Sequence, residues 1–279
     1  MMTPVGLRPF RRGGNGDLFL GRWGATGATV VIKYLRDFGN RRAREAFANQ
    51  VRVLLRGHAG VVPVLSWDLG GERPYYVMPY LERGNLTAWA GRLNDVQVAA
   101  IAETVARTIS AMHALGDLDG DLKLENLLID GAGKIWLADP VGNAAPPISW
   151  VKPSYGGTPG YRAPEVRAGF PISNSTDVYS FGAMLYHLLT ANAPVDGQRL
   201  DKIVEGFWMN GVLRDLITTC CNPDPSERPT MDEVLQLLSG KEWTIVKAER
   251  VKRQVVGAVL LIAVAVAIAA PLLTRRDNS

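Results

Sequence analysis

The chain has few cysteines and no strong excess of charge, and both shortages narrow the possible classes of protein. Only two of its 279 residues are cysteines, Cys220 and Cys221, and they are adjacent. Adjacent cysteines cannot join distant segments and offer no metal-ligand spacing, so we expect a reducing compartment. The 31 basic and 27 acidic side chains leave a net charge of +4, which is too small to indicate a nucleic-acid partner.

An apolar run is also lacking at the N-terminus, where MMTPVGLRPF predicts no signal peptide. The composition is 47% hydrophobic and 21% charged, which excludes a disordered polymer because enough apolar surface exists to offset chain entropy. The length indicates one large domain or two lobes with a substantial core.

One long hydrophobic run is present near the C-terminus. Residues 254–274 carry no charge, and the 19 residues of 255–273 would span roughly 28 Å as a helix, close to the thickness of a bilayer core. Apolar residues occupy every face, so we expect a transmembrane helix rather than a buried helix of the soluble part. The linker 241–254 is basic and favours a cytoplasmic main domain, contact with anionic lipid, and a short tail, 274–279, on the other side. Small residues of the run would permit two copies to pair as a homodimer.

The remaining residues show two kinds of pattern, which predict a β-rich lobe over 1–81 and a larger helical lobe over 82–240. Short apolar runs separated by glycine-rich turns predict antiparallel strands, and longer segments without breakers predict helices. The expected strands cover 18–20, 29–32, 61–67 and 75–80. The expected helices cover 41–56, 96–115, 176–189, 200–208, 212–220 and 231–238. The fold class is therefore α+β.

Five motifs in a fixed order carry the chemistry. A glycine cluster at 11–18 (RRGGNGDL) precedes Lys33 in VVIK, and glycines let a backbone come close to phosphate while a lysine pairs with its charge. The segment 119–130 reads DGDLKLENLLID, and Asp139 follows in LADPV; two carboxylates and an amide at this spacing can hold Mg²⁺ and orient an attacking hydroxyl. The others are GTPGYRAPE at 157–165, STDVYSFG at 175–182 and DPSERPT at 224–230.

These motifs resemble those of eukaryotic-like (Hanks-type) bacterial serine/threonine protein kinases over roughly residues 5–240. The resemblance implies a two-lobed kinase fold, ATP with Mg²⁺ or Mn²⁺, and protein substrates. It assigns the ATP contacts to Phe10, Gly13, Gly14, Gly16, Leu18, Val31, Lys33, Met78, Leu81 and Leu128. It assigns proton acceptance to Asp121, phosphoryl stabilisation to Lys123, metal binding to Asn126 and Asp139, and structural support to Gln50, Glu165, Asp177 and Arg228. Candidate autophosphorylation sites are Ser149, Ser154 and Thr158, of which Thr158 is rather expected to contact the catalytic loop.

The sequence departs from the family pattern at several supporting positions. The helix glutamate that pairs with the strand lysine is replaced by Asn49 or, with a better fit, Gln50, because Glu45 lies more than a turn too early. Asp119-Gly120 stands for the family's His-Arg, and Pro140-Val141 for its Phe-Gly. The main hypothesis is a membrane-anchored protein serine/threonine kinase. The alternatives are a pseudokinase that acts as a nucleotide-binding tethered scaffold, and a small-molecule phosphotransferase.

Overall fold

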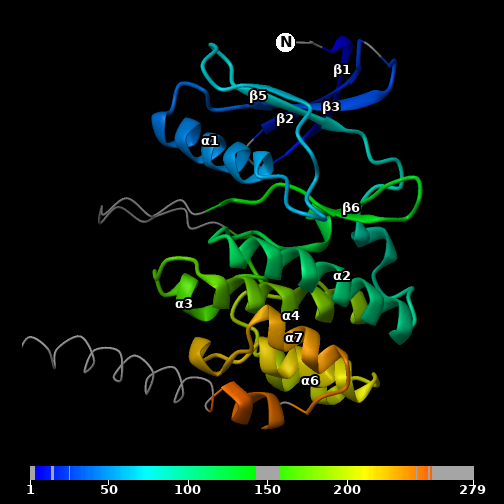
Figure 1. Cartoon of the computed structure of the whole chain (residues 1–279), viewed down its shortest axis with the longest axis vertical. Helices are drawn as coiled ribbons and strands as arrows, with labels where there is room; N and C mark the ends of the chain where they lie inside the picture. Colours follow the sequence, from blue (N-terminus) through cyan, green and yellow to red (C-terminus); the bar gives the residue numbers. More distant parts are fainter. Residues whose placement is uncertain are drawn as a thin grey trace, which may run out of the picture.

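A computed structural model describes residues 4–13, 16–24, 26–142, 157–242, 244–250 and 252. A sheet with one helix against it forms the smaller lobe, and stacked helices form the larger lobe, with the short strand β6 between them (Figure 1). The α+β, two-lobed architecture predicted from the sequence is therefore present.

The smaller lobe contains a five-stranded antiparallel sheet with the strand order β1-β2-β3-β5-β4. Its strands are β1 (Val5–Arg12), β2 (Gly16–Arg22), β3 (Thr29–Leu35), β4 (Ser66–Asp68) and β5 (Tyr75–Pro79). Side chains alternate across the pleat, so Val31 and Lys33 of β3 lie on one face, while Val30 and Ile32 pack on the other with Val77. This alternation points the strand lysine toward the core shared by both lobes.

The helix α1 (Arg41–Leu55) packs its apolar stripe against that same face. Asn40 caps it, because its side-chain oxygen accepts the backbone N–H groups of Arg42 and Ala43. Phe47, Val51 and Leu54 recur at helical spacing and are buried. The cap and the stripe together fix which face of α1 meets the lysine.

The larger lobe is built around α4 (Asn174–Thr190), a helix whose central residues are buried on all sides. Gly182 permits close packing here, because a Cβ at this position would lie 2.6 Å from the Sγ of Cys221. Both cysteines are free and buried, and burial raises the pKa of the Cys220 thiol to about 12. The other elements of this lobe are η1 (Leu86–Trp89), α2 (Asp95–Ala114), η2 (Leu124–Asn126), β6 (Leu127–Ile129), β7 (Ile135–Leu137), α3 (Pro164–Arg167), α5 (Leu200–Ile203), η3 (Val204–Gly206), α6 (Gly211–Cys220), η4 (Pro225–Glu227) and α7 (Met231–Leu238).

Two of the predicted elements are much shorter than expected. The strand expected over 61–67 is reduced to 66–68, because Gly60 has a positive φ and Pro63 donates no hydrogen bond, which leaves Val61 an isolated bridge to Leu137. The helix expected over 200–208 ends at Ile203, passes into one 3₁₀ turn and stops at Gly206.

Residues 244–250 are helical and lie at the base of the larger lobe, far from the sheet (Figure 1). Within the described ranges, no helix is both long and apolar enough to span a bilayer. The predicted transmembrane segment 255–273 and the tail 274–279 lie outside those ranges.

Candidate active site

The glycine-rich hairpin between β1 and β2 is held by Arg36, the residue that follows β3. The N–H of Gly13 donates to the carbonyl of Gly16, and Arg36 donates to the carbonyls of both. Gly16 cannot carry a side chain without a shift, because a Cβ there would lie 2.8 Å from the carbonyl oxygen of Tyr34. Gly14 lies outside the described residues. The hairpin therefore brings backbone without side chains close to β3, the strand that carries Lys33.

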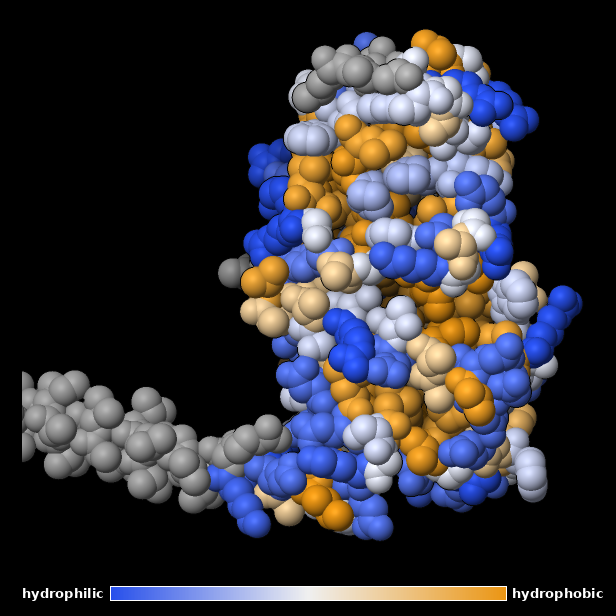
Figure 2. Space-filling model, turned by 45° about the vertical axis from the view of Figure 1, so that its right-hand side comes forward, coloured by the Kyte–Doolittle hydropathy of each residue, from blue (hydrophilic) through white to orange (hydrophobic). Residues whose placement is uncertain are grey.

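Apolar side chains predicted to hold the nucleotide base lie around the junction of the lobes. Val31 pairs with Met78 across β3 and β5, and Leu18, Leu81 and Leu128 are half-buried against the same core. On the face shown in Figure 2, hydrophobic residues reach the surface between the lobes.

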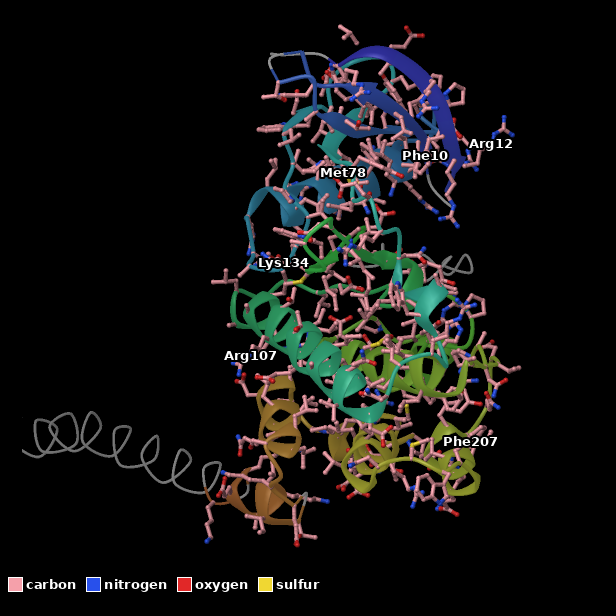
Figure 3. The ribbon with its side chains drawn as sticks, turned by 90° about the vertical axis from the view of Figure 1, so that its right-hand side faces the viewer. Phe10, Arg12, Met78, Arg107, Lys134 and Phe207 are labelled. Atoms are coloured by element: carbon pink, nitrogen blue, oxygen red, sulfur yellow. The ribbon has the colours of Figure 1, made fainter. Side chains whose placement is uncertain are left out.

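Phe10 stands at the edge of this apolar group. Its ring meets that of Tyr80 edge-to-face, with centroids 5.8 Å apart. Figure 3 shows Phe10 and Met78 in the smaller lobe, whereas Arg12 points away from the sheet. These predicted ATP contacts are thus brought together, with Phe10 the most exposed of them.

Lys33 is the buried cation of the site, with 5% of its surface exposed. Its Nζ donates to Oδ1 of Asp139 at 2.7 Å and to Oε1 of Gln50 at 3.4 Å. Glu45 is exposed and pairs with Arg41 instead. The structure therefore places Gln50, and not the acid, beside the lysine, as the sequence spacing favours.

Asp139 has a further donor that sequence reasoning missed. The hydroxyl of Tyr76, in β5, donates to Oδ1 of Asp139 at 2.7 Å. Burial raises the pKa of Asp139, but the nearby Lys33 charge and the hydrogen bonds from Lys33 and Tyr76 outweigh it, so the net pKa lies below the usual value. A signal was available, since a buried tyrosine two residues before Met78 shares its face of β5 and requires a hydrogen-bond partner.

The catalytic loop brings together Asp121, Lys123 and Asn126. Lys123 donates to Oδ2 of Asp121 and, at 2.6 Å, to the hydroxyl of Thr158, which donates to Oδ1 of Asp121 at 2.9 Å. The side-chain amide nitrogen of Asn126 donates to the carbonyl of Asp121 at 2.9 Å. Thr158 therefore contacts the loop as predicted, whereas Ser149 and Ser154 lie outside the described residues.

The loop backbone is anchored from below by Asp177, which accepts the N–H groups of Asp119 and Gly120 at 2.9 and 2.8 Å. His113 also contacts this carboxylate, at 2.9 Å. Ser173, and not Asp177, caps α4. Asp177 thus makes the contact implied by the family resemblance.

Asp119 is a fully buried carboxyl under the same loop. Its Oδ1 accepts the N–H of Asp121, while its Oδ2 has no hydrogen-bond partner in the described part of the chain. Burial, with the charges of Asp177 and Asp121, holds the pKa of Asp119 well above its usual value. Its carbonyl accepts the N–H of Val141 at 2.5 Å, which ties the Pro140-Val141 segment to the loop.

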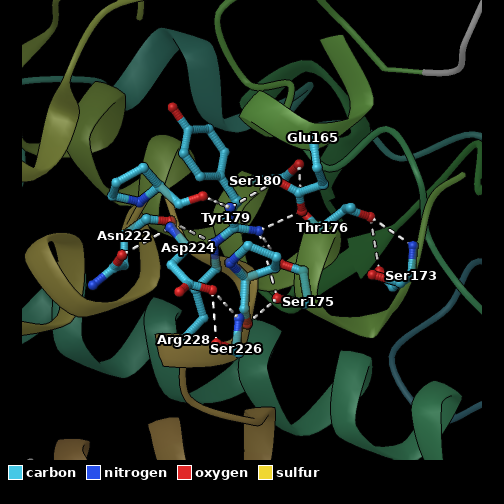
Figure 4. Close-up of polar contacts among 12 residues, drawn as sticks. Glu165, Ser173, Ser175, Thr176, Tyr179, Ser180, Asn222, Asp224, Ser226 and Arg228 are labelled. Atoms are coloured by element: carbon cyan, nitrogen blue, oxygen red, sulfur yellow. Dashed lines mark hydrogen bonds and ion pairs between the residues drawn. The ribbon is translucent and has the colours of Figure 1, made fainter. Parts of the chain in front are cut away.

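Glu165 and Arg228, which the resemblance implies as structural supports, form a buried ion pair (Figure 4). Two parallel hydrogen bonds, of 2.6 and 2.8 Å, join the guanidinium to the carboxylate. The guanidinium also donates to the carbonyls of Asn222, Ser175 and Pro223. The pair thus joins the end of the 157–165 motif to α4 and to the 224–230 motif.

The C-terminal helical residues are fastened to the larger lobe by charge and by burial. Arg250 pairs with Glu233 of α7 and donates to the carbonyl of Arg228 at 3.0 Å, and Lys247 pairs with Glu227. Val246 is buried in the core. Part of the predicted basic linker 241–254 is therefore docked on the larger lobe.

The donor atoms of the site fit a hard divalent cation. Because its amide nitrogen is engaged, Asn126 retains its carbonyl oxygen, and Asp139 retains Oδ2, which has no partner in the described ranges. Such oxygens are the ligands that Mg²⁺ prefers, and a site of two protein ligands is usual where phosphate supplies others.

The fold and this arrangement define a phosphotransferase of the protein kinase class, and comparison with known proteins agrees. The sequence pattern of the protein kinase domain matches residues 11–238, so the chain belongs to the protein kinase family.

Similar proteins include serine/threonine-protein kinase PAK 5 of Rattus norvegicus, 28% identical over 75% of this chain and 31% of that protein. Serine/threonine-protein kinase Pkn1 of Myxococcus xanthus is 29% identical over 70% of this chain and 30% of its own length. DNA damage-responsive serine/threonine-protein kinase RqkA of Deinococcus radiodurans is 32% identical over 66% and 29%, respectively. This chain thus spans under a third of the length of these relatives.

Proposed function

We propose that the chain is an active protein kinase that transfers the γ-phosphate of ATP to serine or threonine hydroxyls of proteins. The observation that carries the proposal is the hydrogen-bonded cluster of Asp121, Lys123 and Thr158 beside Asn126. It supplies a carboxylate and a cation within one short loop, where a hydroxyl and a phosphoryl group must meet. The names of the similar proteins, all serine/threonine kinases, support the same choice of substrate.

The proposed reaction is a direct transfer. The substrate hydroxyl gives its proton to the carboxylate of Asp121 while its oxygen bonds to the γ-phosphorus, and the bond from that phosphorus to the bridging oxygen of ATP breaks, which releases ADP. Lys123 stabilises the charge on the transferred group, and Lys33 pairs with the remaining phosphates. Asn126 and Asp139 would hold Mg²⁺, which would supply positive charge against the phosphates.

The purified full chain with labelled ATP and Mg²⁺ tests this proposal. We expect label on the chain itself or on a generic basic protein, abolished by Asp121→Asn and retained in Asp215→Asn, an exposed aspartate of α6 remote from the site. Label that persists in Asp121→Asn would refute the proposed role of this carboxylate.

A pseudokinase scaffold is the second candidate, favoured by the neutral Gln50 beside Lys33 and by the buried Asp119, whose Oδ2 has no hydrogen-bond partner among the described residues. A scaffold would be stabilised against heat by ATP and would transfer no phosphate. The same preparation therefore separates the two functions.

We propose further that residues 255–273 anchor the kinase in a membrane with its lobes on the cytoplasmic side. The support is the uncharged apolar run and the basic residues before it. The full chain, expressed in a bacterial host, is expected in the membrane fraction after an alkaline wash, and a chain ending at residue 252 in the soluble fraction. Equal release of both would contradict the anchor.

A further inference from the structure

Tyr76 contacts three parts of the site at once. None of its surface is exposed. Its ring packs on Phe47 of α1 with centroids 5.6 Å apart, and the Nζ of Lys33 lies 5.9 Å from the ring centroid. Its hydroxyl donates to Oδ1 of Asp139 at 2.7 Å. A residue of β5 therefore links the helix, the strand lysine and the metal-binding carboxylate.

Among the described residues, few other groups support Asp139. Pro140, which follows it, has no N–H to donate, and Asp139 itself has a positive φ of 57°, which is unfavourable for a residue with a side chain. Its other donor among the described residues, Lys33, is shared with the neutral Gln50, and the proposed function requires it to pair with phosphate when ATP binds. The Tyr76 hydroxyl is the donor that can stay on Oδ1 while the lysine leaves.

The position of this hydroxyl is fixed by packing, because the Tyr76 ring is fully buried and lies against Phe47. The hydrogen bond occupies Oδ1 of Asp139 only. The second oxygen of Asp139 remains available to a cation.

We propose that Tyr76 is a positioning residue that holds the carboxylate of Asp139 in place for Mg²⁺. Its hydrogen bond compensates for the neutral Gln50, which holds Lys33 less firmly than a helix glutamate would. This role rests on the proposed function, because it concerns how the same site retains Mg·ATP. It predicts that the hydroxyl serves metal-dependent nucleotide binding, while the ring serves packing.

The test is Tyr76→Phe in the full chain, with Tyr75→Phe as the matched control. Tyr75 is the neighbouring residue of β5, points to the other face of the sheet and packs on Tyr34. Calorimetry measures ATP binding with excess Mg²⁺ and with a chelator, and steady-state assays measure the Mg²⁺ dependence of transfer. Because hydrogen bonds to charged groups are the strong ones, we expect Tyr76→Phe to weaken Mg·ATP binding about tenfold. Metal-free ATP binding should be unchanged, and the Mg²⁺ requirement should rise.

Three results bear on the proposal in different ways. Equal Mg·ATP affinity and equal Mg²⁺ requirement in Tyr76→Phe and the unmodified chain would overturn it. Equal weakening with and without Mg²⁺ would also overturn it, since the residue would then act through packing alone. An unmodified chain that binds Mg·ATP but transfers nothing would refute the proposed kinase activity, and the calorimetry would still decide the role of Tyr76.

Discussion

Removal of one charge from the Glu165–Arg228 pair should destabilise the larger lobe strongly. The side chain of Arg228 has no exposed surface and that of Glu165 only 15%, so Glu165→Gln leaves a guanidinium charge without a counter-charge in the interior. The carbonyls of Asn222, Ser175 and Pro223 still accept from it, but neutral acceptors do not replace a carboxylate. Loss of one partner from a buried pair costs about 3–5 kcal/mol, and we expect a loss near the lower end because these hydrogen bonds remain.

The matched control is Glu103→Gln, which removes the same charge from an exposed pair with Arg107 one helical turn away. Exposed pairs of this type contribute about 0.5 kcal/mol or less. Urea unfolding at pH 7, followed by tryptophan fluorescence, measures both losses, and added salt should reduce only the control's effect. A loss below about 1 kcal/mol for Glu165→Gln would contradict the account of this pair as a buried, uncompensated charge.

Two other substitutions test the departures from the family pattern. Gln50→Glu replaces a neutral acceptor 3.4 Å from the Nζ of Lys33 by a carboxylate, which strengthens that contact by about 1–2 kcal/mol. We therefore expect a several-fold lower KM for ATP in steady-state assays. An unchanged or higher KM would contradict the role of Gln50. Asp119 has a pKa well above its unfolded value in the folded chain, so the folded chain keeps a proton that the unfolded chain releases. The stability that this proton contributes is therefore lost as pH rises from about 4 through the raised pKa. Asp119→Asn should remove that loss, which amounts to at most about 1.4 kcal/mol per pH unit, and should flatten the stability profile in urea titrations between pH 5 and 8. Parallel profiles for the two chains would show that Asp119 does not titrate in this way.

The helices were largely predictable from sequence because their patterns are local. The run from Arg41 ends one residue earlier than expected, and α2 is displaced by a single position. Strand β1 escaped prediction because Pro9 and two irregularities in its pairing with β2 interrupt the alternation of its side chains. Short strands such as β6 and β7 depend on pairing with each other, which no single segment reveals.

The site divides in the same way. Motif spacing placed Asp121, Lys123 and Asn126 in one loop, where local chain geometry settles their proximity. The contact of Tyr76 with Asp139 joins residues 63 positions apart, and it exists because β5 pairs with β3 so that Tyr76 lies opposite Lys33. Distances of that kind follow from tertiary packing, so the sequence alone identified the carboxylate but not its second donor.

The seat of residues 244–250 on the larger lobe has a mechanical consequence. Arg250 forms an ion pair with Glu233 and donates a hydrogen bond to the carbonyl of Arg228. A force applied at residue 252 would therefore act on the base of the larger lobe, far from the sheet (Figure 1). Arg228 in turn forms an ion pair with Glu165. If residues 255–273 anchor the chain as proposed, a pull on residue 252 would reach the Glu165–Arg228 pair before it reached the sheet of the smaller lobe.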